Sequence, residues 1–555
     1  MPRAERLAAL GLLAAMALSA SAFLVLGHEL TPWSDELDWL TLGDDFTPET
    51  LLTPHNSHLI ALPRAIYELL PRLFGTSYLP FRLIALVAVL ACAALLFILV
   101  RKRVGGVLAL GCATIVLFFG SAPDMALSAV AIPFTLSIAF GLGALVAFDR
   151  DRPRADVAGL VLLVLATLSH TFGVIIAAGI AIQLLAEESN RRRAWTALLP
   201  VALWVAWWIW ARQFDQDITD AVNLAGAPLF VIESAGAALA AVSGAGPSFG
   251  EGADFLEGPS LVLFSLAALA GAGLLFARIR RSGAGPWLLG FVAIALAFWI
   301  GTALSETDAR RPTTPRYLFF GAIMVMLIVA EGLRTRPLGR RLFGGAAVIL
   351  AVGIVLNVAR LGLGAERLQE EANEVRVQLA MIELAGENAT PAFSPATAGA
   401  PGSEQIGARA GELDEFTARH GPLGASLEEV AEASESLRRG ADFVLTRSLG
   451  FFAAPVPPVA ATQAGGCQRF SPGADGSVRF DLPSGVSLIR AREDGSLLIG
   501  RFADSASVYA GELAGAGSVI SIPEDAYPRD WYGVAAEAVR VCEFGAGAGT
   551  GGSPP

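Results

Sequence analysis

The chain has 555 residues, of which 54% are hydrophobic and only 16% are charged, and its mean hydropathy is +0.56. Soluble globular chains rarely have this composition, which is typical of proteins with many membrane-spanning helices. The formal net charge of -11 argues against nucleic acid as a partner, because a polyanion is bound by basic surfaces.

The first apolar segment covers residues 7–26 and follows Arg3 and Arg6. Basic residues mark the cytoplasmic side of a membrane, so we expect a span whose N-terminus lies inside. Ala20-Ser21-Ala22 resembles a cleavage site, and a removed signal peptide is the alternative. The segment is long enough to cross a bilayer core of about 30 Å, which favours a retained anchor. In both cases the next loop emerges outside.

The external loop 28–78 begins with a carboxylate cluster, Trp33-Ser34-Asp35-Glu36-Leu37-Asp38-Trp39. Ionisable groups at the outer boundary of a bilayer are not needed for solubility or orientation, so their default interpretation is a functional site. A solvated acidic loop is the alternative. Farther along, helices are expected after Thr47-Pro48-Glu49 and over Ser57–Phe74, and the leucines of the second predict an amphipathic helix in the membrane interface.

Further spans are expected at 79–100, 105–121, 126–148, 195–212, 259–278, 285–305, 317–333 and 342–361. The stretch 157–186 is too long for one ordinary span, and the basic residues on both of its sides look cytoplasmic. Two short helices that meet outside at Ser169-His170-Thr171-Phe172-Gly173 resolve the conflict, with a single long span as the alternative. The resulting eleven crossings place residue 364 outside, together with an acidic loop over 213–258.

Three arginines lie in the external segment before the span 317–333: Arg310, Arg311 and Arg316. They break the trend that places basic residues inside. A phosphate ligand is one reason for them, because the planar guanidinium fork makes two parallel hydrogen bonds with such a group. Pairing with Asp308 or with the cluster around Asp35 is the other reason, and both remain open.

Residues 364–405 contain a polar helix and a linker rich in Pro, Ala, Gly and Ser. Residues 406–544 predict an external domain that is α/β or β-rich, and the Gly/Ser/Pro-rich tail 545–555 is expected to be disordered. Strands are expected at Val478–Phe480, Val486–Ile489, Leu497–Ile499, Val508–Tyr509 and Val519–Ile522. Cys467 and Cys542 could form one disulfide in an oxidising compartment, whereas no Cys/His spacing predicts a metal site.

The order of these features resembles the GT-C superfamily of membrane glycosyltransferases. The similarity is to the glycosyltransferase family 39-like branch that contains the protein O-mannosyltransferases and the lipid A aminoarabinose transferase. It covers residues 1–361 and rests on Asp35-Glu36, the amphipathic helices of the first loop, the paired helices around Ser169 to Gly173, and Arg316-Tyr317. It implies a polytopic α-helical membrane domain of about eleven spans over residues 1–363. The mainly β external domain that the strand pattern predicts after it has no assigned counterpart in the family.

As activity, the resemblance implies transfer of a sugar from a polyprenyl-phosphate donor to an acceptor hydroxyl at the outer face of the membrane. Asp35 is the first expectation for the catalytic base and Glu36 the second, with Asp38 close enough to keep the choice open. Arg316 matches the arginine that would meet the donor phosphate. Other substrate-binding residues are expected among its neighbours and the external histidines: Arg310, Arg311, His55, His58 and His170.

The resemblance implies that no nucleotide is bound directly. No external cluster has the ligand spacing of a tightly held metal, so we expect no cofactor, with a weakly bound divalent cation as the alternative. The expected partners are the donor, membrane lipids, and a glycan, lipid or protein acceptor. The expected location is the inner membrane of a bacterium, with the C-terminal domain in the periplasm or outside. Two other functions stay open: a transporter or flippase of lipid-linked glycans, and a non-catalytic scaffold for the external domain. A transporter should carry ionisable residues near the bilayer midplane, whereas most charges here lie at the ends of spans.

Overall fold

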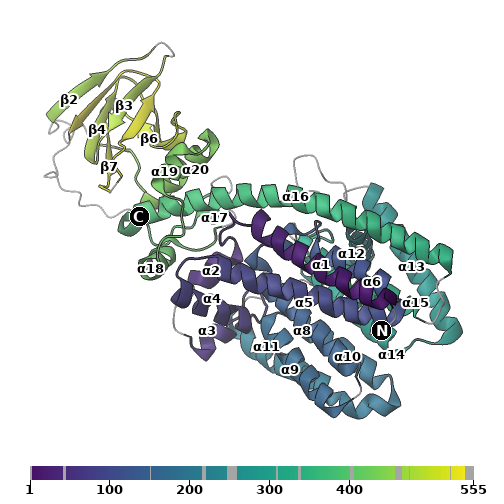
Figure 1. The fold of residues 1–555 in the computed structure, drawn as a ribbon. Helices are drawn as coiled ribbons and strands as arrows, with labels where there is room; N and C mark the ends of the chain where they lie inside the picture. Colours follow the sequence, from purple (N-terminus) through teal and green to yellow (C-terminus); the bar gives the residue numbers. More distant parts are fainter. Residues whose placement is uncertain are drawn as a thin grey trace. The chain divides into compact units, whose positions relative to one another are not determined.

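The structure is a computed structural model, and its elements are labelled in Figure 1. It describes residues 3–41, 46–150, 152–214, 221–246, 259–307, 310–334, 339–399, 406–456, 465–473, 476–525 and 527–543. Contacts divide the chain into a helical unit, Met1–Leu30 with Asp44–Gln369, and a C-terminal unit, Thr31–Gly43 with Glu370–Pro555. The expected membrane domain ends close to this division, but the segment that carries Asp35 and Glu36 belongs to the C-terminal unit.

Helices make up almost all of the helical unit. They are α1 (Arg3–Leu26), α3 (Pro48–Leu52), α4 (Ala61–Phe74), α5 (Leu79–Val104), α6 (Gly106–Leu117), α7 (Pro123–Leu127), α8 (Ile132–Phe148), α9 (Pro153–Ser169), α10 (Phe172–Leu185), α11 (Trp195–Ala211), α12 (Ala227–Val242), α13 (Pro259–Ser282), α14 (Pro286–Leu304), α15 (Pro315–Leu333) and the first part of α16 (Arg340–Ala385). A 3-10 turn, η1 (Ala129–Ala131), leads directly into α8.

In the described part of the chain, seven helices are long and apolar enough to cross a membrane: α1, α5, η1 with α8, α13, α14, α15 and α16. Large apolar side chains on these helices are exposed, among them Leu10 at 62% and Leu274 at 75%. Such surfaces are stable against lipid and costly against water. The chain is therefore a multi-pass membrane protein with a C-terminal β domain.

Each of the eleven predicted spans coincides with a helix, but four of these helices are short. α6 has 12 residues, α10 has 14, and α9 and α11 have 17 each. At 1.5 Å per residue the longest of them reaches about 26 Å, less than a typical bilayer core. Length alone thus supports seven spans in the described residues. The division of 157–186 into two helices is confirmed, whereas the last span and the polar helix after it form one helix, α16.

One helix of this unit differs from the prediction. α12 lies in the segment 213–258, which the sequence predicts to be an external loop, and its alanines pack inside the helical core. The segment resembles a loop because α12 has only 16 residues and contains Glu233. The acids that mark this loop in the sequence lie outside the described residues: Asp215, Asp217, Asp220, Glu251, Asp254 and Glu257. The predicted tail 545–555 and the predicted partner Asp308 also lie outside them.

The amphipathic helix predicted in the first loop is α4. Its leucine side is exposed, with Leu69 at 47% and Leu73 at 62%, while Arg64 and Glu68 are buried at 3% and 6%. This distribution is reversed relative to a helix in water, and it suits a helix whose apolar face lies in the membrane interface. Arg64 and Glu68 are consequently available for contacts inside the protein.

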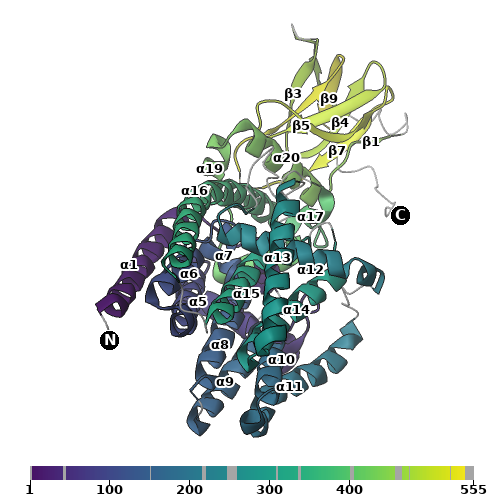
Figure 2. The same cartoon turned by 90° about the vertical axis from the view of Figure 1, so that its right-hand side faces the viewer.

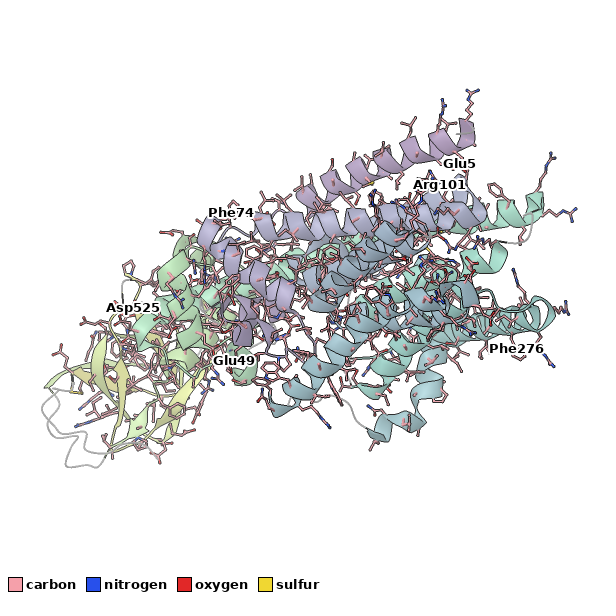
Figure 3. All side chains as sticks on the ribbon, turned by 90° about the horizontal axis from the view of Figure 1, so that it is seen from below. Glu5, Glu49, Phe74, Arg101, Phe276 and Asp525 are labelled. Atoms are coloured by element: carbon pink, nitrogen blue, oxygen red, sulfur yellow. A yellow bond between two sulfur atoms is a disulfide. The ribbon has the colours of Figure 1, made fainter. Side chains whose placement is uncertain are left out.

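Basic residues gather at one end of the helical unit. At the C-terminal end of α5, Nε of Arg101 lies 3.7 Å from a carboxylate oxygen of Glu5, and Nε of Arg103 lies 2.5 Å from one of Glu331. Figure 3 shows Glu5 and Arg101 at the end opposite Phe74, the last residue of α4. This segregation is the one expected if the basic loops lie inside and the first long loop lies outside.

The C-terminal unit combines short helices with two antiparallel sheets. Its helices are α2 (Asp35–Thr41), the end of α16, α17 (Pro395–Ala398), α18 (Ala410–His420), α19 (Leu427–Glu432) and α20 (Glu435–Leu449). Its strands are β1 (Ala454–Pro455), β2 (Gly465–Phe470), β3 (Val478–Leu482), β4 (Gly485–Ala491), β5 (Gly495–Gly500), β6 (Val508–Leu513), β7 (Ser518–Ile522), β8 (Trp531–Ala535) and β9 (Val539–Glu543). The sheet orders are β1-β7-β4-β9-β2 and β3-β8-β5-β6.

The five predicted strands are confirmed as β3 to β7. In β3 the side chains alternate, with Val478, Phe480 and Leu482 buried and the residues between them exposed, as in a sheet with one face in a core. Cys467 of β2 and Cys542 of β9 form a disulfide across neighbouring strands, with their Cα atoms 4.0 Å apart.

Candidate functional site

Two histidines lie in a tight turn that follows α3. The backbone N–H of His55 donates to the carbonyl of His58 at 3.0 Å, and the N–H of His58 donates to the carbonyl of His55 at 2.8 Å. Asn56 and Ser57 between them have φ angles of 49° and 64°, in the left-handed region that residues other than glycine rarely adopt. The turn therefore stores backbone strain, and it fixes the positions from which the two imidazole rings extend.

The third external histidine, His170, lies between α9 and α10. Ser137 of α8 donates from its Oγ to the carbonyls of Ala166 at 2.9 Å and His170 at 3.3 Å, which ties this turn to α8. Gly173 lies so close to the end of α9 that a Cβ there would be 2.2 Å from the carbonyl carbon of Ala166. The glycine thus permits the sharp reversal between α9 and α10, which lie side by side with α8 (Figure 2).

The two histidine segments meet inside the helical unit. The rings of His58 and His170 have their centroids 4.3 Å apart, and Nδ1 of His58 forms a hydrogen bond of 2.9 Å with Oγ1 of Thr171. Phe134 and Phe172 also contact the ring of His170, with centroid distances of 4.6 Å and 4.4 Å. Residues far apart in the sequence thus build one site around His170.

The two ring nitrogens of His170 have different surroundings. Nδ1 accepts the backbone N–H of Phe172 at 3.3 Å, so in the neutral ring the proton is on Nε2. Burial lowers the pKa of His170 well below 6.5, and the positive charges of His58, Arg316 and His55 lower it further. Nε2 is buried and has no hydrogen-bond partner among the described residues. A buried donor in this state costs about 1–3 kcal/mol, and a ligand oxygen would satisfy it.

Arg316 brings a permanent positive charge to the same site. It is the second residue of α15, and its guanidinium lies 5.4 Å from the centroid of the Tyr317 ring. Its charge acts on the pKa of His170, which places it near the imidazole rings. Arg310 and Arg311 lie in the turns before α15, and neither is among the charges that lower the pKa of His170.

We refer to His55, His58, His170 and Arg316 as the His–Arg cluster. All four are substrate-binding residues predicted from the sequence, and the structure brings them together within the helical unit. The cluster combines a guanidinium with a neutral imidazole N–H donor for which the described part of the chain offers no acceptor. Donors of this kind bind an oxyanion, and a phosphate matches both the guanidinium and the N–H group.

The structure also identifies supporting residues that the sequence does not. Thr171 and Phe172 belong to the predicted turn, but only the fold shows that they hold His58 and His170. Phe134 comes from α8, where an apolar residue in an apolar helix carries no signal of a site. The histidine between two short apolar helices is the signal by which the sequence points to this region, but it does not identify these supporting residues.

The predicted catalytic acids lie in α2 of the C-terminal unit. Glu36 is completely buried at 0% exposure, whereas Asp35 and Asp38 are partly exposed. One turn apart on the helix, Asp35 and Asp38 have carboxylate oxygens within 4.8 Å of each other. Gly407 lies so close to α2 that a Cβ there would be 3.2 Å from a carboxylate oxygen of Asp38. Of the two predicted bases, Asp35 is thus the more accessible.

The same pair of carboxylates fits a weakly bound divalent cation. Magnesium is commonly held by one or two carboxylates together with phosphate oxygens of a substrate. Asp35 and Asp38 offer two such oxygen ligands close together.

No protein-family model matches the chain, and no curated protein matches its sequence. Among solved structures, the chain is similar to an archaeal oligosaccharyltransferase, AglB from Archaeoglobus fulgidus, in complex with an inhibitory peptide and a dolichol-phosphate. The identity is 12%, the TM-score is 0.42, and the match covers 83% of this chain and 73% of that chain. At this identity and TM-score, the likeness carries neither residue correspondences nor an activity over to this chain.

Proposed function

We propose that the protein is a membrane glycosyltransferase that moves a sugar from a polyprenyl-phosphate donor to an acceptor hydroxyl at the outer face of the membrane. The sequence resemblance to GT-C enzymes supports this assignment. So do the apolar helices, between which polyprenyl tails could lie. The observation that carries the proposal is the His–Arg cluster, because a lipid phosphate at the membrane boundary needs donors of this kind.

In the proposed reaction the acceptor oxygen attacks the anomeric carbon of the donor sugar. The bond from that carbon to the phosphate oxygen breaks, and its electron pair leaves with the phosphate. Negative charge on the phosphate grows as the bond breaks, so Arg316 and Nε2–H of His170 would stabilise the transition state more than the bound donor. Because His170 is neutral, its donor does not depend on protonation near neutral pH.

The acceptor proton goes to a carboxylate, for which we propose Asp35. It is partly exposed, whereas Glu36 is buried, and a catalytic base must reach the hydroxyl from which it takes the proton. Glu36 remains the second candidate. If a divalent cation binds, Asp35 and Asp38 would hold it.

The location of the protein, its acceptor and the roles of Arg310 and Arg311 are proposals as well. We propose the inner membrane of a bacterium, with the C-terminal unit on the outer side, where the disulfide between Cys467 and Cys542 suits an oxidising compartment. The acceptor would be a glycan, lipid or protein hydroxyl. Arg310 and Arg311 are proposed as outer contacts of the donor, because they lie in the turns before Arg316 and α15.

Lipid binding by the purified full-length protein in detergent tests the proposal. Tryptophan fluorescence would be measured during titration with a polyprenyl phosphate and, separately, with the corresponding polyprenol. The wild type should prefer the phosphate, and Arg316→Ala should remove most of that preference. His28→Ala is the matched control, because the side chain of His28 is 63% exposed and lies outside the cluster. Equal affinity of the wild type for the two lipids would refute a phosphate site.

A further inference from the structure

We infer that Arg64 is a positioning residue of the His–Arg cluster: it clamps the segment before the His55–His58 turn and so holds the ring of His58 against His170. Its effect on donor binding rests on the proposed function, whereas its effect on the position of His58 does not. Arg64 belongs to α4 and has no place among the residues that the sequence predicts for the site.

The guanidinium of Arg64 lies against the end of α3. It donates to the backbone carbonyls of Thr50 at 2.7 Å and Pro54 at 3.4 Å, and also to the carbonyl of Thr53. The last carbonyls of a helix have no partners within the helix, so a buried cation is well placed there. Arg64 itself is only 3% exposed, so water does not compete for these bonds.

This clamp acts directly on the strained turn. Pro54 is the residue before His55, and the left-handed conformations of Asn56 and Ser57 persist only if the surrounding structure holds both ends of the turn. On the far side the chain is fixed by Leu59, which is 3% exposed. On the near side, Arg64 supplies the contacts that resist unwinding. His58 is the last residue of this turn, so the contacts of Arg64 that hold the turn also determine where the ring of His58 lies.

A second contact holds the same segment from another helix. Nε1 of Trp207 in α11 donates to the carbonyl of Leu52 at 2.7 Å, next to the carbonyls that Arg64 binds. Leu59 and Trp207 also share a small apolar cluster. The segment from Leu52 to Pro54 is therefore held by two side chains, one from α4 and one from α11, and Arg64 is the one that makes several bonds.

The chemistry of the clamp requires an arginine. Three carbonyls in different directions match the planar fork of a guanidinium, whereas the ammonium of a lysine is a point charge on a flexible stem. Burial lowers the pKa of Arg64 to about 10, and Glu68 acts in the opposite direction, so the group is charged at neutral pH. Arg64→Lys therefore keeps the charge and loses the geometry.

A general loss of stability must be separated from a positioning effect, and the chain offers a matched control. Arg82 in α5 is also 3% exposed and also donates to backbone carbonyls, those of Phe23 and Leu127. Neither carbonyl belongs to the segment before the histidine turn. Arg82→Lys thus removes a clamp of the same kind at another place in the same unit.

The first experiment needs no ligand. The chain contains five histidines, so a histidine-labelled NMR spectrum of the full-length protein in detergent is tractable, and single substitutions assign His58 and His170. Arg64→Lys should shift the ring signals of both, because their rings are in contact, and should leave the signals of His28 and His420 in place. Arg82→Lys should leave all of these signals unchanged. Equal shifts in the two variants, or none in Arg64→Lys, would overturn the inference.

The second experiment measures affinity for the polyprenyl phosphate. We expect Arg64→Lys to weaken binding about tenfold, the usual loss when one well-placed donor to a charged group is misplaced. In a His58→Ala background, Arg64→Lys should have little further effect, because both changes remove the same contact. Additive losses would show that Arg64 does not act through His58. If the wild type itself fails to bind the lipid, the proposed function loses its donor, while the NMR shifts still decide the role of Arg64.

Trp207→Phe provides a milder variant for the case in which Arg64→Lys does not fold. It removes the hydrogen bond to Leu52 and keeps an aromatic ring in the apolar cluster. The same two ring signals should shift in the same direction by a smaller amount. Unchanged His58 and His170 signals in this folded variant would contradict the view that the segment from Leu52 to Pro54 positions the cluster.

Discussion

Replacing His170 by phenylalanine should separate ligand binding from stability. The new ring keeps the aromatic packing against Phe134 and Phe172 and removes both nitrogens. Loss of Nε2–H removes a buried donor that costs about 1–3 kcal/mol without a partner. Loss of Nδ1 leaves the buried N–H of Phe172 without its acceptor, which costs about 1–3 kcal/mol. The two effects have opposite signs and similar size, so the free energy of unfolding should change by no more than about 2 kcal/mol.

Affinity for a polyprenyl phosphate should respond very differently to His170→Phe. A hydrogen bond to a charged phosphate is worth about 1.5–3 kcal/mol, so the dissociation constant should rise by about 10- to 150-fold. Thermal unfolding in detergent measures the first quantity, and fluorescence titration with the lipid measures the second. His28→Phe is the control for both. A variant that is strongly destabilised but binds the lipid normally would refute the assignment of Nε2–H as a ligand donor.

Three further outcomes follow from the same geometry. The pKa of His170 is lowered in the folded protein, so as the pH falls the unfolded chain is protonated at this histidine before the folded chain is. The contribution of neutral His170 to stability should therefore be fully present above pH 6.5 and decrease as the pH drops below it. Thermal unfolding measured against pH should show this slope for the wild type and lack it for His170→Phe. Ser57→Gly should raise the free energy of unfolding by about 1 kcal/mol, because φ at this position is 64° and glycine adopts this conformation without strain. An unchanged melting temperature would argue against strain in the turn. Gly173→Ala should cost about 2 kcal/mol or more, since its Cβ would meet the backbone of Ala166 at 2.2 Å, and normal thermal stability would disprove this tight approach.

Hydropathy and charge carry most of the information about the helices. Long apolar runs bounded by basic loops predict α1, α5, α13, α14 and α15, because these helices face lipid and must be apolar along their length. α12 is not predicted from a long apolar run, because a helix that packs through its alanines inside a bundle does not need the length of a membrane span, and α12 has only 16 residues. The strands β3 and β7 are predictable from alternation, since every second residue is buried, whereas β4 buries three residues in a row and is predictable only as a short apolar run.

The site is predictable in its charged residues and not in its supports. His55, His58, His170 and Arg316 stand out as polar groups at the outer ends of apolar segments. Arg64 does not stand out, because an arginine in an amphipathic helix normally faces water, and only the fold turns it inward. The neighbours of His170 are determined by the packing of α8, α9 and α10 against one another. A local sequence pattern does not predict this packing.

The glycan and lipid profile of cells that carry Asp35→Ala with Glu36→Ala tests the central claim most directly, after equal membrane abundance with the wild type has been established. The account predicts the loss of one glycan together with accumulation of its polyprenyl-phosphate sugar, which would also identify the donor. If the lipid-linked glycan is instead no longer moved across the membrane, a flippase would explain the protein better. An unchanged profile, in a strain whose deletion mutant is altered, would contradict the catalytic assignment.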